Sequence, residues 1–194
     1  MDASGGRQTA GEALRIARSE LTVRLEVVSN RDWGYPTPCG EWNVRQLVNH
    51  VVGLHHRVAG LLRGGSRKQY IETREDDWLG SDHMKAWYDG VRELDEAIAA
   101  TADLDVTVAY RIPVAARDVI ALTAFETAVH TWDISRALHI DEHLDDGLIE
   151  FSLRFMRWIR TQPDLAIAFD TPGIGLDGRA PPHAQLLHLA GRKP

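Results

Sequence analysis

The sequence lacks several features that mark common classes of protein. Its single cysteine, Cys39, cannot form an internal disulfide, and a lone thiol is typical of a reducing compartment. No apolar run approaches the roughly 20 residues needed to cross a bilayer. The N-terminal stretch MDASGGRQTAGEAL also contains no apolar core of the kind that a secretory signal carries. These absences predict a cytoplasmic protein that does not span a membrane.

An excess of positive charge is also missing. The chain has 22 Lys and Arg against 28 Asp and Glu, a formal net charge of -6, and its basic residues are scattered along the sequence. Proteins that bind DNA or RNA gather their basic residues into a patch or stripe. We therefore expect no nucleic acid and no membrane as a partner, and a small molecule as the substrate.

What the sequence does contain is helical periodicity. With 194 residues, 44% of them hydrophobic, the chain is long enough for one domain with a sizeable core, which we assign to residues 1–194. Apolar residues recur at three- and four-residue spacing, as they do on the buried face of an amphipathic helix. The predicted helices are 11–30, 44–62, 82–100, 117–138, 145–160 and a short one at 182–190.

Two segments between these helices are less regular. Residues 67–81 are polar and predict a long connection or a short helix. VTVAYRIP, residues 106–113, partly alternates β-branched and aromatic residues, which predicts a short strand or an extended lid. The helix from Val44 should begin there because Asn43 and Gln46 can form a capping box. The predicted fold is all-α, an antiparallel four-helix bundle with a short strand or hairpin and a C-terminal extension.

The stretch FETAVHTWD places Glu126 and His130 four residues apart on the predicted helix 117–138. Such positions lie one turn apart on the same side of a helix, so the two side chains can reach one ion. The alternative is an ordinary surface pair, which contributes only about 0.2–0.5 kcal/mol. Val119 and Leu122 share this side of the helix and indicate burial, and a buried carboxylate needs a partner such as a cation.

A third metal ligand should come from a facing helix. His50 in QLVNHVVGLHH is the best candidate because its neighbours are apolar, although a lone histidine in this setting also fits a core residue without a metal. Arg57 lies two turns further along the same face, where it could hold an anionic substrate or extend to solvent. His55 and His56 point away from this face and are interpreted as solvated or interface histidines.

Cys39 and Asp133 each have two interpretations. Cys39, in the turn TPCGEW, is interpreted as a buried structural thiol rather than a nucleophile, so no catalytic nucleophile is assigned to the protein. Asp133, close to one turn beyond His130, could orient that ligand or receive a proton. It could equally form a surface pair with Arg136, three residues further on.

Three runs of sequence together resemble a known family: TPCGEWNVRQLVNHVVG, FETAVHTWDISRAL and APPHAQLLHLAGRKP. They are similar to actinobacterial proteins related to the N-terminal domain of mycothiol-dependent maleylpyruvate isomerase, within the DinB-like metal-binding helical bundles. The resemblance implies a DinB-like bundle and a divalent metal held by His50, Glu126 and His130. It also implies mycothiol as a co-substrate and a homodimer as an expected assembly.

Two histidines and one carboxylate leave one position of a tetrahedral zinc ion open, as in catalytic rather than structural zinc sites. Such an ion activates a water or a thiol, and the resemblance favours the thiol. The predicted function is a metal-dependent, zinc-containing thiol S-transferase or isomerase that uses mycothiol or a similar thiol on an electrophile. Two alternatives stay open: a non-catalytic bundle that binds a metal or ligand, and a cyclase or hydrolase of secondary metabolism on the same scaffold.

Overall fold

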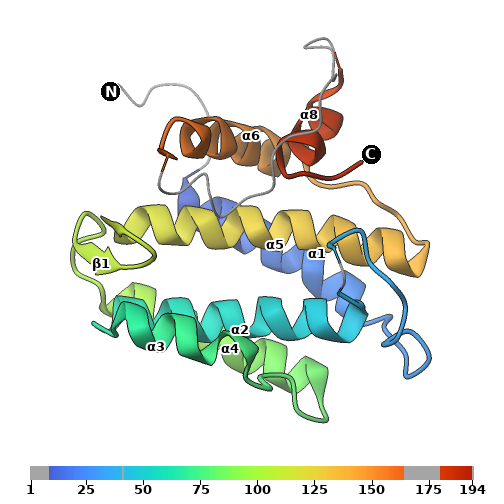
Figure 1. The fold of residues 1–194 in the computed structure, drawn as a ribbon, viewed down its shortest axis with the longest axis horizontal. Helices are drawn as coiled ribbons and strands as arrows, with labels where there is room; N and C mark the ends of the chain where they lie inside the picture. The colour runs from blue at the N-terminus through green and yellow to red at the C-terminus, as the bar shows by residue number, and fades with distance from the viewer. Residues whose placement is uncertain (1–8, 41, 164–179, 194) are drawn as a thin grey trace.

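A computed structural model describes residues 9–40, 42–163 and 180–193 (Figure 1). Its elements are α1 (Ala10–Leu25), α2 (Val44–Leu62), α3 (Arg67–Glu72), the 3-10 helix η1 (Thr73–Glu75), α4 (His83–Ala100), β1 (Thr107–Ala109), β2 (Pro113–Ala115), α5 (Ala116–Leu138), α6 (Asp146–Arg160) and α8 (Pro182–Leu189). The prediction of an all-α fold with a small hairpin is confirmed. Part of the predicted C-terminal extension, residues 164–179, lies outside the described residues. None of the described helices combines the length and hydrophobicity needed to cross a membrane.

Four helices, α1, α2, α4 and α5, form the bundle, while α6 packs on α5 and α8 packs on α6 (Figure 1). Helices α1 and α2 run in opposite directions, and so do α4 and α5. Helices α2 and α4 run in the same direction, because α3 and η1 lead the chain back to the end of the bundle where α2 begins. This arrangement places α2 directly against α5, which are the two helices that carry the predicted ligands.

Local side-chain contacts explain where the helices begin and end. Helix α2 begins at Val44 as predicted, because the Asn43 side chain accepts a hydrogen bond from the Gln46 backbone at 2.9 Å and the Gln46 side chain accepts one from the Asn43 backbone at 3.0 Å. Helix α1 ends before the predicted residue 30. There the Asp32 carboxylate accepts hydrogen bonds from the backbone and hydroxyl of Ser29, which stabilise a turn instead.

The two segments with irregular sequence patterns both contain secondary structure. Residues 67–81 contain the short helices α3 and η1, in agreement with the short-helix interpretation. The predicted strand is a hairpin in which β1 pairs antiparallel with β2, Thr107 opposite Ala115 and Ala109 opposite Pro113. The hairpin leads directly into α5, so it fixes the start of the helix that carries Glu126 and His130.

His55 was expected to be solvated or at an interface, and the expectation of solvent is wrong: the residue is fully buried between helices. Arg18 donates from Nε to His55 Nε2 at 3.2 Å and pairs with Asp95 at 2.5 Å. Because an arginine only donates, Nε2 must be the acceptor, and the ring proton lies on Nδ1, which donates to the Val51 carbonyl at 2.9 Å. His55 is therefore a neutral core residue that links α1, α2 and α4.

The burial of His55 predicts a pH dependence of stability. Burial, followed by the charge of Arg18, lowers the pKa of His55 from 6.5 to about 3. Between these two pH values the unfolded chain binds a proton that the folded chain excludes. The unfolding free energy should therefore fall on acidification, by up to about 1.4 kcal/mol per pH unit.

Urea unfolding at pH 7, 6 and 5 in the presence of a chelator measures this slope. His55→Gln, which cannot titrate, should be less stable at pH 7 and should lose less stability as the pH falls. Equal slopes for the two proteins would contradict the assignment of the proton to His55.

Gly53 on α2 allows a close approach by Trp78, which follows η1. A Cβ atom at position 53 would lie 2.4 Å from Cδ1 of the Trp78 ring. This ring cannot move easily, because its Nε1 donates to the Thr73 carbonyl at 2.9 Å and its face stacks on His56 at 5.0 Å. The space that the glycine leaves on α2 is thus filled by an indole.

Gly53→Ala should therefore destabilise the protein by about 1–3 kcal/mol through overpacking, despite the better helix propensity of alanine. Gly60→Ala on the same helix is the matched control, because a Cβ there would meet nothing within 4 Å. It should stabilise the protein by about 0.5–1 kcal/mol. Thermal unfolding followed by tryptophan fluorescence compares the two, and a shift of both midpoints in the same direction would contradict the steric argument.

Candidate metal centre

The three predicted ligands come together between α2 and α5. His50 projects from α2, and Glu126 and His130 project from successive turns of α5. His50 Nε2 lies 3.3 Å from Glu126 Oε2, and one donor atom from each of the three residues lies within 4.8 Å of the other two. The imidazole rings of His50 and His130 are 5.3 Å apart and nearly perpendicular. One ion could therefore contact both rings and the carboxylate.

The donor set, and the distance between two of its donor atoms, fit a small divalent ion. Ligand atoms at about 2.0–2.1 Å from a tetrahedral zinc ion lie about 3.4 Å from each other. The 3.3 Å between His50 Nε2 and Glu126 Oε2 is close to this value. Two imidazoles and one carboxylate are also ligands that zinc, iron, nickel and manganese accept. Metal binding and the identity of the metal stay predictions.

A buried carboxylate fixes the orientation of His130. Its Nδ1 lies 2.9 Å from Asp133 Oδ2, and because a carboxylate accepts, Nδ1 carries the proton. The lone pair of Nε2 is then available for a metal. Asp133 in turn accepts hydrogen bonds from Arg192, from Nε at 2.9 Å and from Nη2 at 2.7 Å. The alternative surface pair of Asp133 with Arg136 is not formed, because Arg136 pairs with Glu142.

The protonation states favour metal binding by two of the three residues. Burial lowers the pKa of His50, which keeps its imidazole neutral. Burial acts to raise the pKa of Glu126, but the hydrogen bond with His50 and the nearby positive charges lower it, so the carboxylate is ionised. Burial would lower the pKa of His130 as well, but its hydrogen bonds with Asp133 and Cys39 raise it to about 9. A metal would therefore displace a proton from His130.

The turn before α2 supplies two more groups that the spacing of the sequence did not assign to the site. The Trp42 ring lies 4.7 Å from the His50 ring and 6.4 Å from the His130 ring. Cys39 is half-buried rather than buried, and its thiol hydrogen-bonds with His130. Cys39, His130 and Asp133 form a second cluster that could hold an ion. The carboxylate of Asp133 is already bound by His130 and Arg192, so the cluster with His50 and Glu126 fits a metal better.

Arg57, the predicted substrate-binding residue, does not extend to solvent. It is 6% exposed, and its guanidinium lies 4.7 Å from the centre of the Tyr70 ring. Arg192 was not singled out in the sequence, and no spacing rule connects it with Asp133, which lies 59 residues earlier.

The sequence profile of the mycothiol maleylpyruvate isomerase N-terminal domain family matches residues 14–135. The chain belongs to this family. The matched range includes His50, Glu126, His130 and Asp133 and ends before Arg192. Membership of the maleylpyruvate isomerase N-terminal domain family confirms the resemblance drawn from the sequence.

Two further comparisons found proteins similar in sequence or in fold. Two uncharacterized proteins of Mycobacterium tuberculosis, from strains CDC 1551 and H37Rv, are 28% identical over 136 residues, which cover 68% of this chain and 69% of each relative. The crystal structures of a mycothiol-dependent maleylpyruvate isomerase and of its histidine-to-alanine mutant superpose with TM-scores of 0.59 and 0.61. Both are 16% identical, over 79% of this chain and 72% of theirs. These two structures share the fold of this chain.

Proposed function

We propose that this chain is a metal-dependent enzyme that uses mycothiol or a similar small thiol on an electrophilic small molecule, as an S-transferase or an isomerase. The observation that carries the proposal is the cluster of His50, Glu126 and His130, whose donor atoms lie within 4.8 Å of one another. The family profile and the mycothiol-dependent isomerase of similar fold support a thiol rather than water as the nucleophile.

Each residue in and next to the cluster has a proposed role. His50, Glu126 and His130 hold the ion, which we propose to be zinc. When bound, zinc would lower the pKa of a thiol and so provide a thiolate nucleophile at neutral pH. Asp133 holds His130 in the tautomer that can ligate, and Arg192 keeps the Asp133 carboxylate ionised through its hydrogen bonds.

The cluster is slightly less buried on one side than on the other. The side chains of His50 and Glu126 retain 12% and 17% of their exposure, whereas those of His130 and Asp133 retain 8% and 0%. A thiol would therefore approach from the side of His50 and Glu126. The Trp42 ring, whose centre lies 4.7 Å from that of His50 at a tilt of 41°, would limit the water that reaches the same ring.

The test begins with protein purified without a metal-binding tag. Elemental analysis should find close to one divalent ion per chain. The zinc-loaded protein should then accelerate the consumption of mycothiol by monochlorobimane, and chelator treatment should remove this activity.

Each other outcome points to a different conclusion. Tight binding of metal and thiol without turnover would favour a non-catalytic bundle. Conversion of a substrate without any thiol would favour a tailoring enzyme. Protein that contains no metal, and whose stability is unchanged by chelator, would overturn the proposal.

A further inference from the structure

Arg57 is a buried cation that forms no salt bridge with any of the described residues. Its side chain is 6% exposed, and Nε donates to the Gly53 carbonyl at 3.2 Å. Nη2 is buried and has no hydrogen-bond partner among the described residues. A charge removed from water without a partner is costly, so such groups are normally paired. This guanidinium therefore has an edge that can bind an anion.

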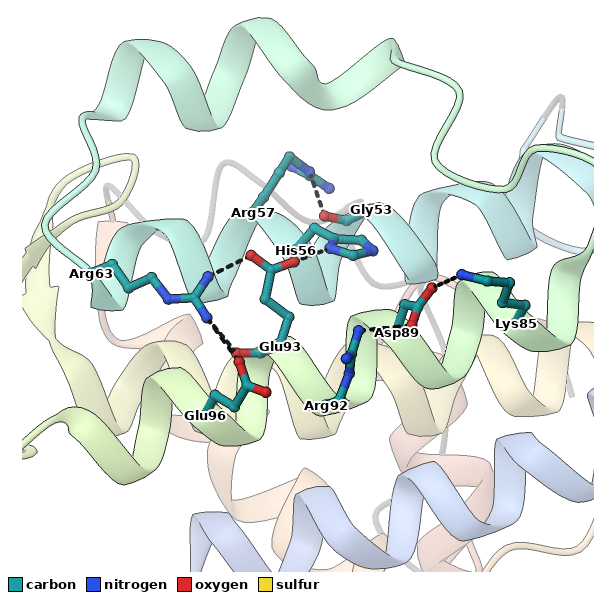
Figure 2. Close-up of polar contacts among 9 residues, drawn as sticks. All are labelled: Gly53, His56, Arg57, Arg63, Lys85, Asp89, Arg92, Glu93 and Glu96. Carbon is teal, nitrogen blue, oxygen red and sulfur yellow. Dashed lines mark hydrogen bonds and ion pairs between the residues drawn. The ribbon is translucent and has the colours of Figure 1, made fainter.

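The guanidinium of Arg57 is directed toward the metal cluster. Gly53 lies one turn before Arg57 on α2, so the hydrogen bond to its carbonyl folds the side chain back in the direction of His50. Figure 2 shows Arg57 on the side of α2 that faces α3, whereas His56 of α2 and Arg63, directly after the helix, reach Glu93 of α4. Arg57 is thus separate from the salt-bridge network between α2 and α4.

Two tyrosines complete the surroundings. Arg57 lies over the Tyr70 ring at 4.7 Å, and the Tyr110 ring packs edge to face against Tyr70 at 5.2 Å. Burial raises the pKa of Tyr70 to about 12 and raises that of Tyr110 further, so both phenols keep their protons at neutral pH. The Arg57 guanidinium and the protonated phenol next to it are hydrogen-bond donors, which suit an anion.

The net charge of the site, with a divalent ion bound, would also favour an anion. Asp133 is neutralised by Arg192, which leaves Glu126, among the residues that the structure describes, as the carboxylate near both the metal position and Arg57. A divalent ion and Arg57 carry three positive charges against the single negative charge of Glu126. A thiolate cancels one of the two remaining positive charges, and one is left for the substrate.

We propose that Arg57 binds a carboxylate of the electrophilic substrate, and that the site selects electrophiles that carry a carboxylate over neutral ones. The planar guanidinium can present Nη1 and Nη2 to the two oxygens of a carboxylate. This assignment rests on the proposed function and specifies the substrate class for the same site.

A matched pair of ligands tests the assignment. Monomethyl fumarate and dimethyl fumarate share one carbon skeleton, and only the first carries a carboxylate. Calorimetric titration of the zinc-loaded full chain, without thiol so that no reaction occurs, should show monomethyl fumarate binding at least ~10-fold more tightly. Arg57→Gln should remove this preference, and Arg57→Lys should keep part of it, because a lysine retains the charge without the planar fork.

Arg31→Gln is the control for net charge, because Arg31 is 84% exposed, and it should keep the full preference. If Arg57→Gln does not fold, the ¹⁵N resonances of the Arg57 side chain in the wild-type protein give a second measurement. They should shift with monomethyl fumarate and stay in place with dimethyl fumarate. Equal binding of the two esters by the wild-type protein, or a preference that survives in folded Arg57→Gln, would overturn the assignment.

The experiment separates this assignment from the proposed function. Zinc content and thiol addition to dimethyl fumarate are measured on the same preparations. Turnover of the diester without any preference for the carboxylate refutes the role of Arg57 and leaves the proposed function in place. A preference that depends on Arg57 in a protein without turnover supports the anion site and refutes the proposed enzyme.

Discussion

His130→Ala should lower the affinity for zinc about 100- to 1000-fold, because a ligand is removed from a site that has three. The fold should persist, since the substitution shortens a side chain within α5 and leaves the contact between Asp133 and Arg192 in place. Competition with a chromophoric chelator measures the affinity, and elemental analysis measures the stoichiometry.

His56→Ala is the matched control for this prediction. His56 lies on α2 like His50 but hydrogen-bonds with Glu93 of α4 at 2.5 Å, so it does not contribute to the cluster. The control should bind zinc as the wild-type protein does. Unchanged zinc binding in folded His130→Ala would refute the assignment of this histidine as a ligand.

Asp133→Asn should have two effects of different origin. It removes the carboxylate that contacts the buried side chain of Arg192, which is 9% exposed, and such a change costs about 3–5 kcal/mol of unfolding free energy. It also weakens the hydrogen bond that orients His130, which should lower the affinity for zinc about 10- to 100-fold. Urea unfolding in chelator measures the first effect, and chelator competition measures the second.

Glu142→Gln makes the same chemical change in a pair that is partly exposed. Glu142 lies 3.2 Å from Arg136, and the side chains retain 33% and 42% of their exposure, so its loss should cost less than about 1 kcal/mol. It should leave zinc binding unchanged. The two variants should thus differ clearly, and equal costs would show that the contact between Asp133 and Arg192 contributes little.

The sequence predicts the helices well because their stability comes from long, regular apolar faces. The start of α2 at Val44 follows from the capping box alone, a contact within four residues. The parallel course of α2 and α4 has no local signal, because it depends on how α3 and η1 cross the bundle. The burial of His55 is missed for a similar reason. Helical period shows which side of α2 it occupies, but not that Arg18 and Asp95 approach that side from two other helices.

The candidate site was also predictable only where its contacts are local in the sequence. Glu126 and His130 are recognisable as a pair because one helix holds them a turn apart, and apolar neighbours predict the inward direction of His50. Arg192 could not be predicted, because its contact with Asp133 joins α5 to the segment that follows α8. The burial of Arg57 depends on Tyr70 of α3, in a segment whose sequence also suited a plain connection.

The contact between Arg192 and Asp133 couples metal binding to the docking of the C-terminal segment, so that each process stabilises the other. If the segment after α8 stabilises the ligating form of His130, then a metal on His130 must stabilise the segment by the same free energy. Loading with zinc should therefore slow amide hydrogen exchange in α8, which contributes none of the three ligands. The rate of amide hydrogen exchange in α8, more than 50 residues along the chain from His130, would then report whether the protein contains metal.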